Sequence, residues 1–147
     1  MSPLSPEVQD EWSRAERALR TAQALVAEDP DAAASRAYYA AFHAVSALLA
    51  FEGQSYRKHS AVERAVHRDL VKTGRWTPEV GAAFSWLANL RYTGDYGGEA
   101  HVQISEAREA VEKAAMVLQS VRGSIPVPET LPQEEDLHSE DDPDEEG

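Results

Sequence analysis

The feature that most constrains the fold is an alanine-rich segment that begins at Pro30 and stops at Gly53. Alanine favours the helix, and large side chains such as Tyr38, Phe42 and Leu49 add apolar surface around most of the circumference. A helix that is apolar on most sides must be enclosed by other helices. We therefore expect a central helix from about Pro30 to Glu52 in an all-α protein.

Apolar periodicity and capping signals predict four further helices around it. They are expected to run from Ser5 to Asp29, from Ser60 to about Thr73, from Thr77 to about Tyr92, and from Ser105 to Gly123. Ser60 and Glu63 are predicted to form a capping box, and Gly94, Gly97 and Gly98 are predicted to break the fourth helix. No segment alternates as a strand would.

The net charge of −12 belongs mostly to the C-terminus, because residues 126–147 contain ten acidic residues and no Lys or Arg. Residues 1–125 carry 16 acidic and 14 basic residues, so this part is nearly neutral. We predict a helical domain over 1–125 and a disordered acidic tail over 126–147. The tail either solvates the protein or mimics nucleic acid over a basic site, and the low pI does not argue against a nucleic-acid partner.

The composition also bears on compartment. At 147 residues one domain is expected, and the absence of cysteine excludes disulfides and thiolate metal sites and fits a reducing compartment. The N-terminus lacks the basic and apolar regions of a signal peptide, and no apolar run reaches the roughly 18 residues of a membrane helix. The prediction is a cytoplasmic protein that does not contact the membrane.

The first candidate site is on the central helix, where Arg36, Tyr39 and His43 recur at spacings of three and four and so share one face. Arg36 and His43 are about 10 Å apart along the axis, so a phosphate could lie between their side chains. The alternative interpretation is a buried polar network in which each group has a protein partner.

Two further candidate sites follow in the sequence. Arg57 and His59 precede the predicted third helix, where cations and a helix N-terminus suit an anion, although a basic loop also serves solubility. Arg91, Asp95 and Tyr96 are near the glycines that follow helix four. Arg91 could hold a phosphate, or Asp95 could pair with Arg91 while Tyr96 docks on the core.

Several familiar motifs are missing from the sequence. There is no phosphate-binding loop ending in Lys-Ser/Thr, no His-Glu-x-x-His zinc pattern and no serine nucleophile elbow. A helix-turn-helix from the third and fourth helices is disfavoured by Arg75-Trp76 in the turn. We predict no metal and no cofactor.

Three blocks together resemble the HEPN superfamily: residues 35–49, residues 56–60, and residues 91–97, in the expected order and spacing. The resemblance covers about residues 10–122. It implies an up-and-down bundle of four to five helices, usually a homodimer, often encoded beside a minimal nucleotidyltransferase in a toxin–antitoxin pair. It also implies that active members are metal-independent ribonucleases with an Arg-x(4–6)-His motif on a late helix, where His acts as acid–base and Arg stabilises the phosphorane.

This chain departs from that motif, because Asp95-Tyr96 follows Arg91 where the histidine is expected, and the next histidine is His101. The leading hypothesis is therefore a non-catalytic dimer that works with a nucleotidyltransferase and binds nucleotide or RNA phosphate through Arg57, His59 and Arg91. The alternative is a ribonuclease toxin that uses Arg36 with His43, or Arg91 with His59 or His101. A third possibility is a structural dimer without a ligand.

Overall fold

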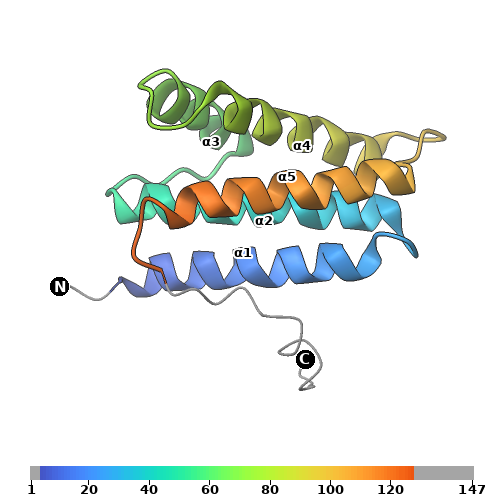
Figure 1. The fold of residues 1–147 in the computed structure, drawn as a ribbon, viewed down its shortest axis with the longest axis horizontal. Helices are drawn as coiled ribbons and strands as arrows, with labels where there is room; N and C mark the ends of the chain where they lie inside the picture. The colour runs from blue at the N-terminus through green and yellow to red at the C-terminus, as the bar shows by residue number, and fades with distance from the viewer. Residues whose placement is uncertain (1–3, 128–147) are drawn as a thin grey trace.

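A computed structural model describes residues 4–127, and within this range the chain is helical with no strand. The elements are α1 (Pro6–Leu25), α2 (Pro30–Phe51), α3 (His59–Ala65), the π-helix η1 (Val66–Val71), α4 (Pro78–Tyr96) and α5 (Ile104–Arg122). The long helices run alternately up and down, and α3 and η1 lie at one end, beside the start of α4 (Figure 1). The prediction of an all-α, up-and-down bundle is confirmed.

The starts of three helices follow the capping signals in the sequence. Ser5 Oγ accepts from the Val8 N–H at 3.2 Å, Asp29 accepts from Ala32 at 3.2 Å, and Thr77 accepts from Val80 at 3.4 Å. Each of these capping residues is followed by proline at the first helical position, where its missing N–H costs nothing. Local sequence therefore sets where α1, α2 and α4 begin.

The alanine-rich segment is the central helix, as predicted. It contacts α1, α4 and α5, and lies between α1 and α4 in Figure 1. Alanines on several of its sides are fully buried, and so are Tyr38 and Leu48. Small side chains let neighbouring backbones approach α2 closely, while the large ones fill the remaining core.

The predicted capping box at Ser60 and Glu63 is wrong. Helix α3 begins one residue earlier, at His59, and no side chain caps it. Glu63 instead accepts a hydrogen bond from Ser85 on α4 at 2.9 Å, so a tertiary contact takes the carboxylate away from the local cap. The described residues do contain a capping box at α5, formed by Gln103 and Glu106, two residues before the predicted start at Ser105.

Helix α4 continues through Gly94 to Tyr96, so the predicted break near Tyr92 is wrong. Gly94 lies against the start of α2, where an added Cβ would be 3.0 Å from the Asp31 carbonyl oxygen. This glycine permits close packing of two helices and does not end one. The helix stops at Gly97, and Gly98 follows with a φ of +64°, in the left-handed region.

The predicted third helix changes geometry partway along. After α3 the chain forms the π-helical turn η1, in which the Lys72 N–H donates to the His67 carbonyl at 2.9 Å, five residues back. Such turns are rare and often occur at functional sites. Gly74, with a φ of +85°, then reverses the chain towards α4.

The described chain ends with Ile125 and Val127 buried against the core, so packing continues slightly past the predicted domain boundary at 125. The rest of the predicted tail, residues 128–147, lies outside the described residues. None of the helices within residues 4–127 has the length and apolar character needed to cross a bilayer.

Candidate functional site

Aromatic side chains of α2 surround the histidine that begins α3. The His59 ring centroid lies 4.5 Å from that of Phe42 and 5.6 Å from those of both Tyr38 and Tyr39. Tyr38 is itself packed against Phe84 of α4, with 5.9 Å between centroids. Three helices thus meet at these rings, and we call Tyr38, Tyr39, Phe42 and His59 the aromatic cluster.

Arg91 of α4 lies over this cluster. Its guanidinium carbon is 5.1 Å from the centroid of the Tyr38 ring and 5.9 Å from that of Tyr39, within the range of cation–π attraction. Its side chain is only 16% exposed, its Nη1 is 3.5 Å from Asp95, and its buried Nε has no hydrogen-bond partner in the described part of the chain. The cation is held mainly by aromatic faces and is only weakly neutralised by a carboxylate.

The surroundings shift the pKa of two groups in the cluster. Burial lowers the pKa of His59 from its ordinary 6.5, and the positive charges of Arg91 and His43 lower it further. Burial raises the pKa of Tyr38 to about 12, with Arg91 acting in the opposite direction. His59 is therefore mostly neutral at pH 7, beside an arginine that is always charged.

The first predicted group, on α2, also comes together. The guanidinium carbon of Arg36 lies 5.2 Å from the centroid of Tyr39, whose ring lies 6.3 Å from that of His43. His43 Nδ1 is 2.7 Å from a carboxylate oxygen of Glu11 on α1. The face predicted for these residues thus carries a line of contacts, and the imidazole already has an anionic partner.

Arg57 is not in contact with this cluster. Its side chain is exposed, and among residues 4–127 it has no hydrogen bond or ion pair. The chain connectivity alone keeps it near, two residues before His59. Of the three residues predicted to bind phosphate together, His59 and Arg91 lie against the same two tyrosine rings and Arg57 does not.

Of the third predicted group, Arg91 and Asp95 lie together and Tyr96 lies apart from them on the surface. Asp95 pairs with Arg91, whereas Tyr96 is 64% exposed and its ring stacks at 5.2 Å on that of the exposed Tyr92, so Tyr96 does not dock on the core. His101 Nδ1 lies 2.8 Å from Asp31, which also accepts from the Val102 N–H at 2.8 Å. His101 therefore serves the junction between α5 and α2.

Sequence reasoning does not identify Glu11 or the role of Tyr38. Glu11 is 32 residues from His43 and belongs to another helix, so no local pattern links them. The sequence indicates Tyr38 only as an apolar residue of the central helix. Among the described residues, no group of three His, Asp or Glu side chains is placed to hold a metal ion.

Helices that enclose an alanine-rich centre, with an arginine and a histidine against aromatic rings of that central helix, define a bundle with a polar site. The family model of the HEPN domain matches residues 8–124. The chain belongs to the HEPN domain family.

Relatives of similar length support this assignment. The chain is 38% identical over 93 residues to a UPF0332 protein of Thermotoga maritima, which covers 63% of this chain and 70% of that protein. It is 32% identical over 118 residues to the UPF0332 protein glr0978 of Gloeobacter violaceus, covering 79% and 94%. A Methanocaldococcus jannaschii protein named "Putative toxin MJ0142" is 29% identical over 110 residues, covering 74% and 75%.

A solved structure shares the fold. The crystal structure of TT1696 from Thermus thermophilus superposes with a TM-score of 0.71 at 23% identity, covering 82% of this chain and all of that one. At this identity the likeness establishes the arrangement of the helices.

Proposed function

We propose that this HEPN protein binds the phosphate of a nucleotide or RNA at Arg91 and His59, without cleaving it, and acts as the homodimeric partner of a minimal nucleotidyltransferase. The main observation in support of this binding site is that the guanidinium of Arg91 is only weakly paired. Among residues 4–127 the one carboxylate that pairs with it is Asp95, at 3.5 Å, and its buried Nε has no acceptor there. An anion that reached this guanidinium would supply the acceptors that the protein does not.

The surroundings of Arg91 favour a phosphate over a simple ion. The guanidinium is planar and presents paired N–H donors that match phosphate oxygens, and the rings of Tyr38 and Tyr39 hold its plane. His59 adds a neutral ring next to the cation, and its N–H can donate. Arg36, over the outer side of Tyr39, supplies a second exposed cation on the same cluster.

Titration of labelled RNA and nucleotides with wild-type protein and Arg91→Ala tests this binding. We expect Arg91→Ala to weaken binding about tenfold or more, since a charge-assisted hydrogen bond contributes about 1.5–3 kcal/mol. Arg14→Ala is the matched control, because Arg14 is an exposed cation of α1 that pairs with Asp10. Equal affinity of Arg91→Ala and wild type would refute the site.

The nucleotidyltransferase partnership rests on family membership, because HEPN proteins are often paired with that enzyme. Co-expression with a minimal nucleotidyltransferase from the same organism, followed by size-exclusion chromatography, tests it. We expect a single complex containing both chains. Separate elution of the two proteins would refute the partnership and leave the phosphate site to be judged by titration.

A ribonuclease is the second candidate, and one observation favours it. His59 is mostly neutral at pH 7 and so can accept a proton, and it lies beside the charged Arg91, which could stabilise a phosphorane. An enzyme of this kind would arrest bacterial growth on expression, with relief by His59→Ala, His43→Ala or Arg91→Ala. Our proposal predicts no arrest and no RNA cleavage by the purified wild-type protein.

A further inference from the structure

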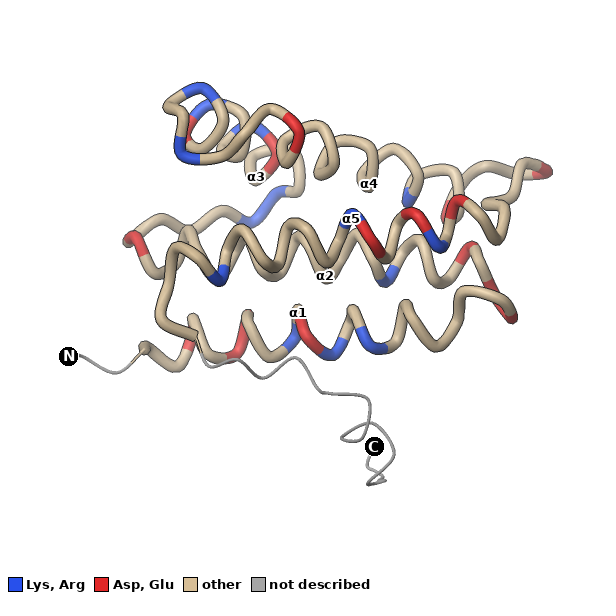
Figure 2. The backbone as a smooth tube through the Cα atoms, viewed as in Figure 1, with Lys and Arg blue, Asp and Glu red and all other residues tan. Residues whose placement is uncertain are grey.

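The segment from Arg57 to Arg75 is strongly basic in an acidic chain. It holds six of the 14 Lys and Arg residues but only two acidic ones, Glu63 and Asp69. Figure 2 shows these cations along the connection into α3, along α3 and η1, and in the turn that follows. The proposed phosphate site uses only the start of this segment, so most of its positive charge has no assigned role.

Much of this charge lines one opening on the surface of the bundle. A groove of about 550 Å³ follows α3 and η1, and its lining residues are Ser60, Glu63, Arg64, His67, Arg68 and Lys72. We call it the α3–η1 groove. Arg64, Arg68 and Lys72 recur every four residues along α3, η1 and the residue that follows η1. The groove therefore presents a row of three cations.

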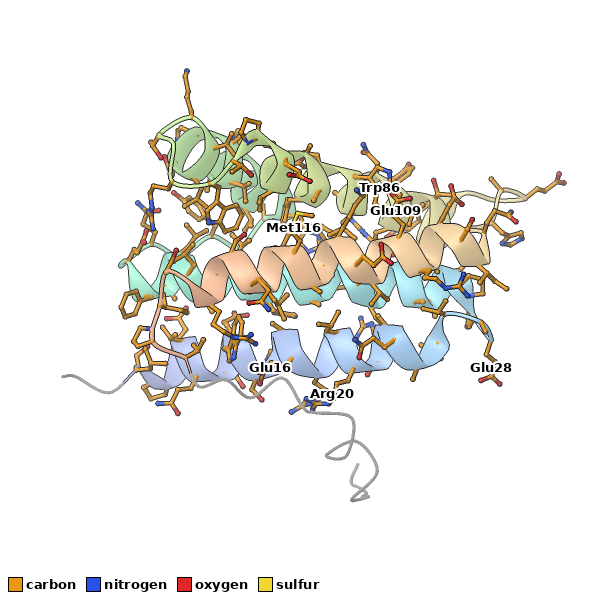
Figure 3. The ribbon with its side chains drawn as sticks, in the orientation of Figure 1. Glu16, Arg20, Glu28, Trp86, Glu109 and Met116 are labelled. Atoms are coloured by element: carbon orange, nitrogen blue, oxygen red, sulfur yellow. The ribbon has the colours of Figure 1, made fainter. Side chains whose placement is uncertain are left out.

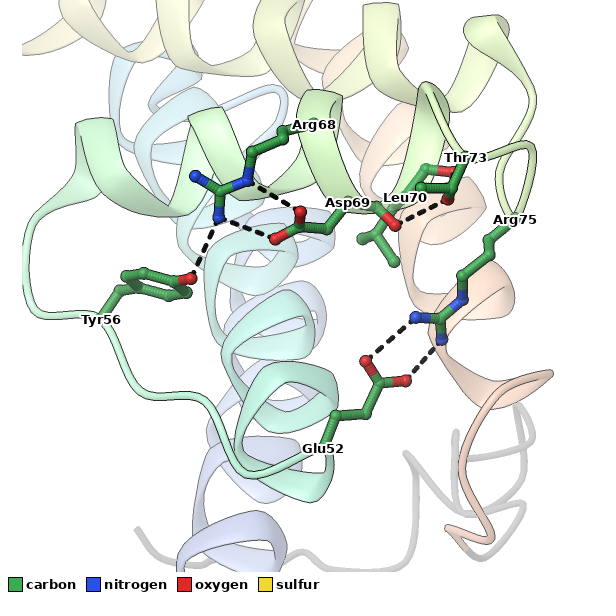
Figure 4. Close-up of polar contacts among 7 residues, drawn as sticks. All are labelled: Glu52, Tyr56, Arg68, Asp69, Leu70, Thr73 and Arg75. Atoms are coloured by element: carbon green, nitrogen blue, oxygen red, sulfur yellow. Dashed lines mark hydrogen bonds and ion pairs between the residues drawn. The ribbon is translucent and has the colours of Figure 1, made fainter.

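The three cations differ in how far the protein already engages them. Arg68 donates from Nε and Nη2 to Asp69, both at 2.8 Å, and from Nη2 to the Tyr56 hydroxyl at 3.1 Å (Figure 4). The side chains of Arg64 and Lys72 are exposed, and in the described part of the chain neither side chain has a hydrogen bond or ion pair. The charge of these two residues is available to a ligand.

The carboxylate in the groove is already engaged by α4. Ser85 donates to Glu63 at 2.9 Å and lies 2.8 Å from His67 Nε2. Because the single hydroxyl proton of Ser85 goes to Glu63, His67 must donate to Ser85 from Nε2. This network fixes the wall of the groove against α4 and draws the acid away from Arg64 and Lys72.

The same carboxylate connects the groove to the aromatic cluster. Glu63 lies one helical turn beyond His59 on α3, and the His59 ring lies 5.6 Å from that of Tyr38. Tyr38 is the ring over which Arg91 lies. Helix α3 thus supplies residues both to the groove and to the aromatic cluster.

We infer that the α3–η1 groove binds phosphates of a single-stranded RNA, another phosphate of which occupies the Arg91 site. This inference rests on the proposed function and names its ligand class, an RNA strand of several nucleotides in place of a mononucleotide. Arg64 and Lys72, two exposed cations in one groove, suit a polyanion, because each neutralised phosphate releases condensed counterions and adds affinity. A mononucleotide would occupy Arg91 and leave Arg64 and Lys72 unused.

The test compares the double variant Arg64→Gln/Lys72→Gln with Arg17→Gln/Arg20→Gln in the full-length chain. Arg17 and Arg20 are cations of α1 without an ion pair among residues 4–127, and Figure 3 shows Arg20 on the side of the bundle away from α3. Both variants remove two positive charges. Binding is measured by fluorescence anisotropy over a range of salt concentrations, with labelled AMP and with labelled RNA of about 12 nucleotides.

We expect the groove variant to weaken binding of the long RNA about tenfold or more, and to reduce the slope of log K against log salt by about 1.4, or about 0.7 per lost phosphate contact. Mononucleotide affinity should not change, and the α1 variant should resemble wild type. If the two double variants bind the long RNA with equal affinity, and this binding still requires Arg91, the groove is not an RNA site but the proposed function stands. If the wild-type protein binds no RNA or nucleotide, both the groove inference and the proposed function are refuted. If only the groove variant changes its oligomeric state, the groove is a protein contact and not an RNA site.

Discussion

The guanidinium carbon of Arg91 lies 5.1 Å from the centroid of the Tyr38 ring, so the last turns of α4 are held on the middle of α2 by a cation over an aromatic face. Tyr38 is fully buried and Arg91 is mostly buried. Because this contact positions both the end of α4 and the guanidinium proposed to bind phosphate, it couples the stability of the bundle to the geometry of the site.

Replacing Tyr38 by leucine tests this contact. Tyr38→Leu keeps an apolar side chain but removes the ring face, and we expect a loss of about 1–3 kcal/mol in the free energy of unfolding together with weaker phosphate binding. Tyr38→Phe retains the ring and should preserve both properties more closely. Urea unfolding and titration of both variants provide the measurement, and equal behaviour of the two would contradict a role for the ring.

The pair of His43 and Glu11 predicts a difference between neighbouring carboxylates of α1. Glu11→Ala should cost about 1–2 kcal/mol, since it leaves the partly buried His43 without its partner at 2.7 Å. Asp10→Ala removes a partner of the exposed Arg14 and should change stability by less than about 1 kcal/mol. Chemical denaturation ranks the two, and a larger effect of Asp10→Ala would show that the pair contributes little.

His59 predicts the direction of a pH effect. Because its pKa is lowered in the folded protein, the unfolded chain binds a proton more readily below about pH 6.5. The contribution of His59 to stability is thus complete above pH 6.5 and declines as the pH falls from there through the folded pKa. We expect the difference in unfolding free energy between wild type and His59→Gln to shrink as the pH falls below about 6.5, and a pH-independent difference would contradict a lowered pKa of His59.

Gly94 predicts an exception to helix propensity. In an exposed helix interior Gly→Ala stabilises by about 1 kcal/mol. An added Cβ at Gly94, however, would be 3.0 Å from the Asp31 carbonyl oxygen. Gly94→Ala should therefore destabilise, whereas Gly123→Ala, where the nearest atom is 3.6 Å away, should be neutral or mildly stabilising. Thermal melts of both variants measure this, and stabilisation by Gly94→Ala would show that α2 and α4 are less closely packed.

Much of the fold could be predicted because local chemistry decides it. The Ser5, Asp29 and Thr77 caps, each before a proline, set three helix starts, and the apolar circumference of α2 places it at the centre. The errors arise where a distant residue decides the outcome. The local sequence makes Gly94 look like a helix breaker, because it does not show that Gly94 packs against Asp31. It makes Glu63 look like a capping residue, because it does not show that Glu63 bonds to Ser85, 22 positions away.

The candidate site is predictable only in part for the same reason. The spacing of Arg36, Tyr39 and His43 indicates a shared face, but no pattern places Arg91 over Tyr38 or joins His43 to Glu11. Arg57 is grouped with His59 because they are close in sequence, yet only His59 enters the aromatic cluster. Closeness in sequence suggests which residues could form the site, and tertiary packing decides which of them do.

The most direct test of the central claim, that Arg91 and His59 together form a phosphate site, is an NMR titration of the full-length protein with a nucleoside monophosphate. The imidazole signals of His59 and the Nε–H signal of Arg91 should shift together and saturate at one ligand concentration, while those of His101, which pairs with Asp31, stay in place. Shifts confined to other residues, or no shift at either group at saturating ligand, would contradict the account.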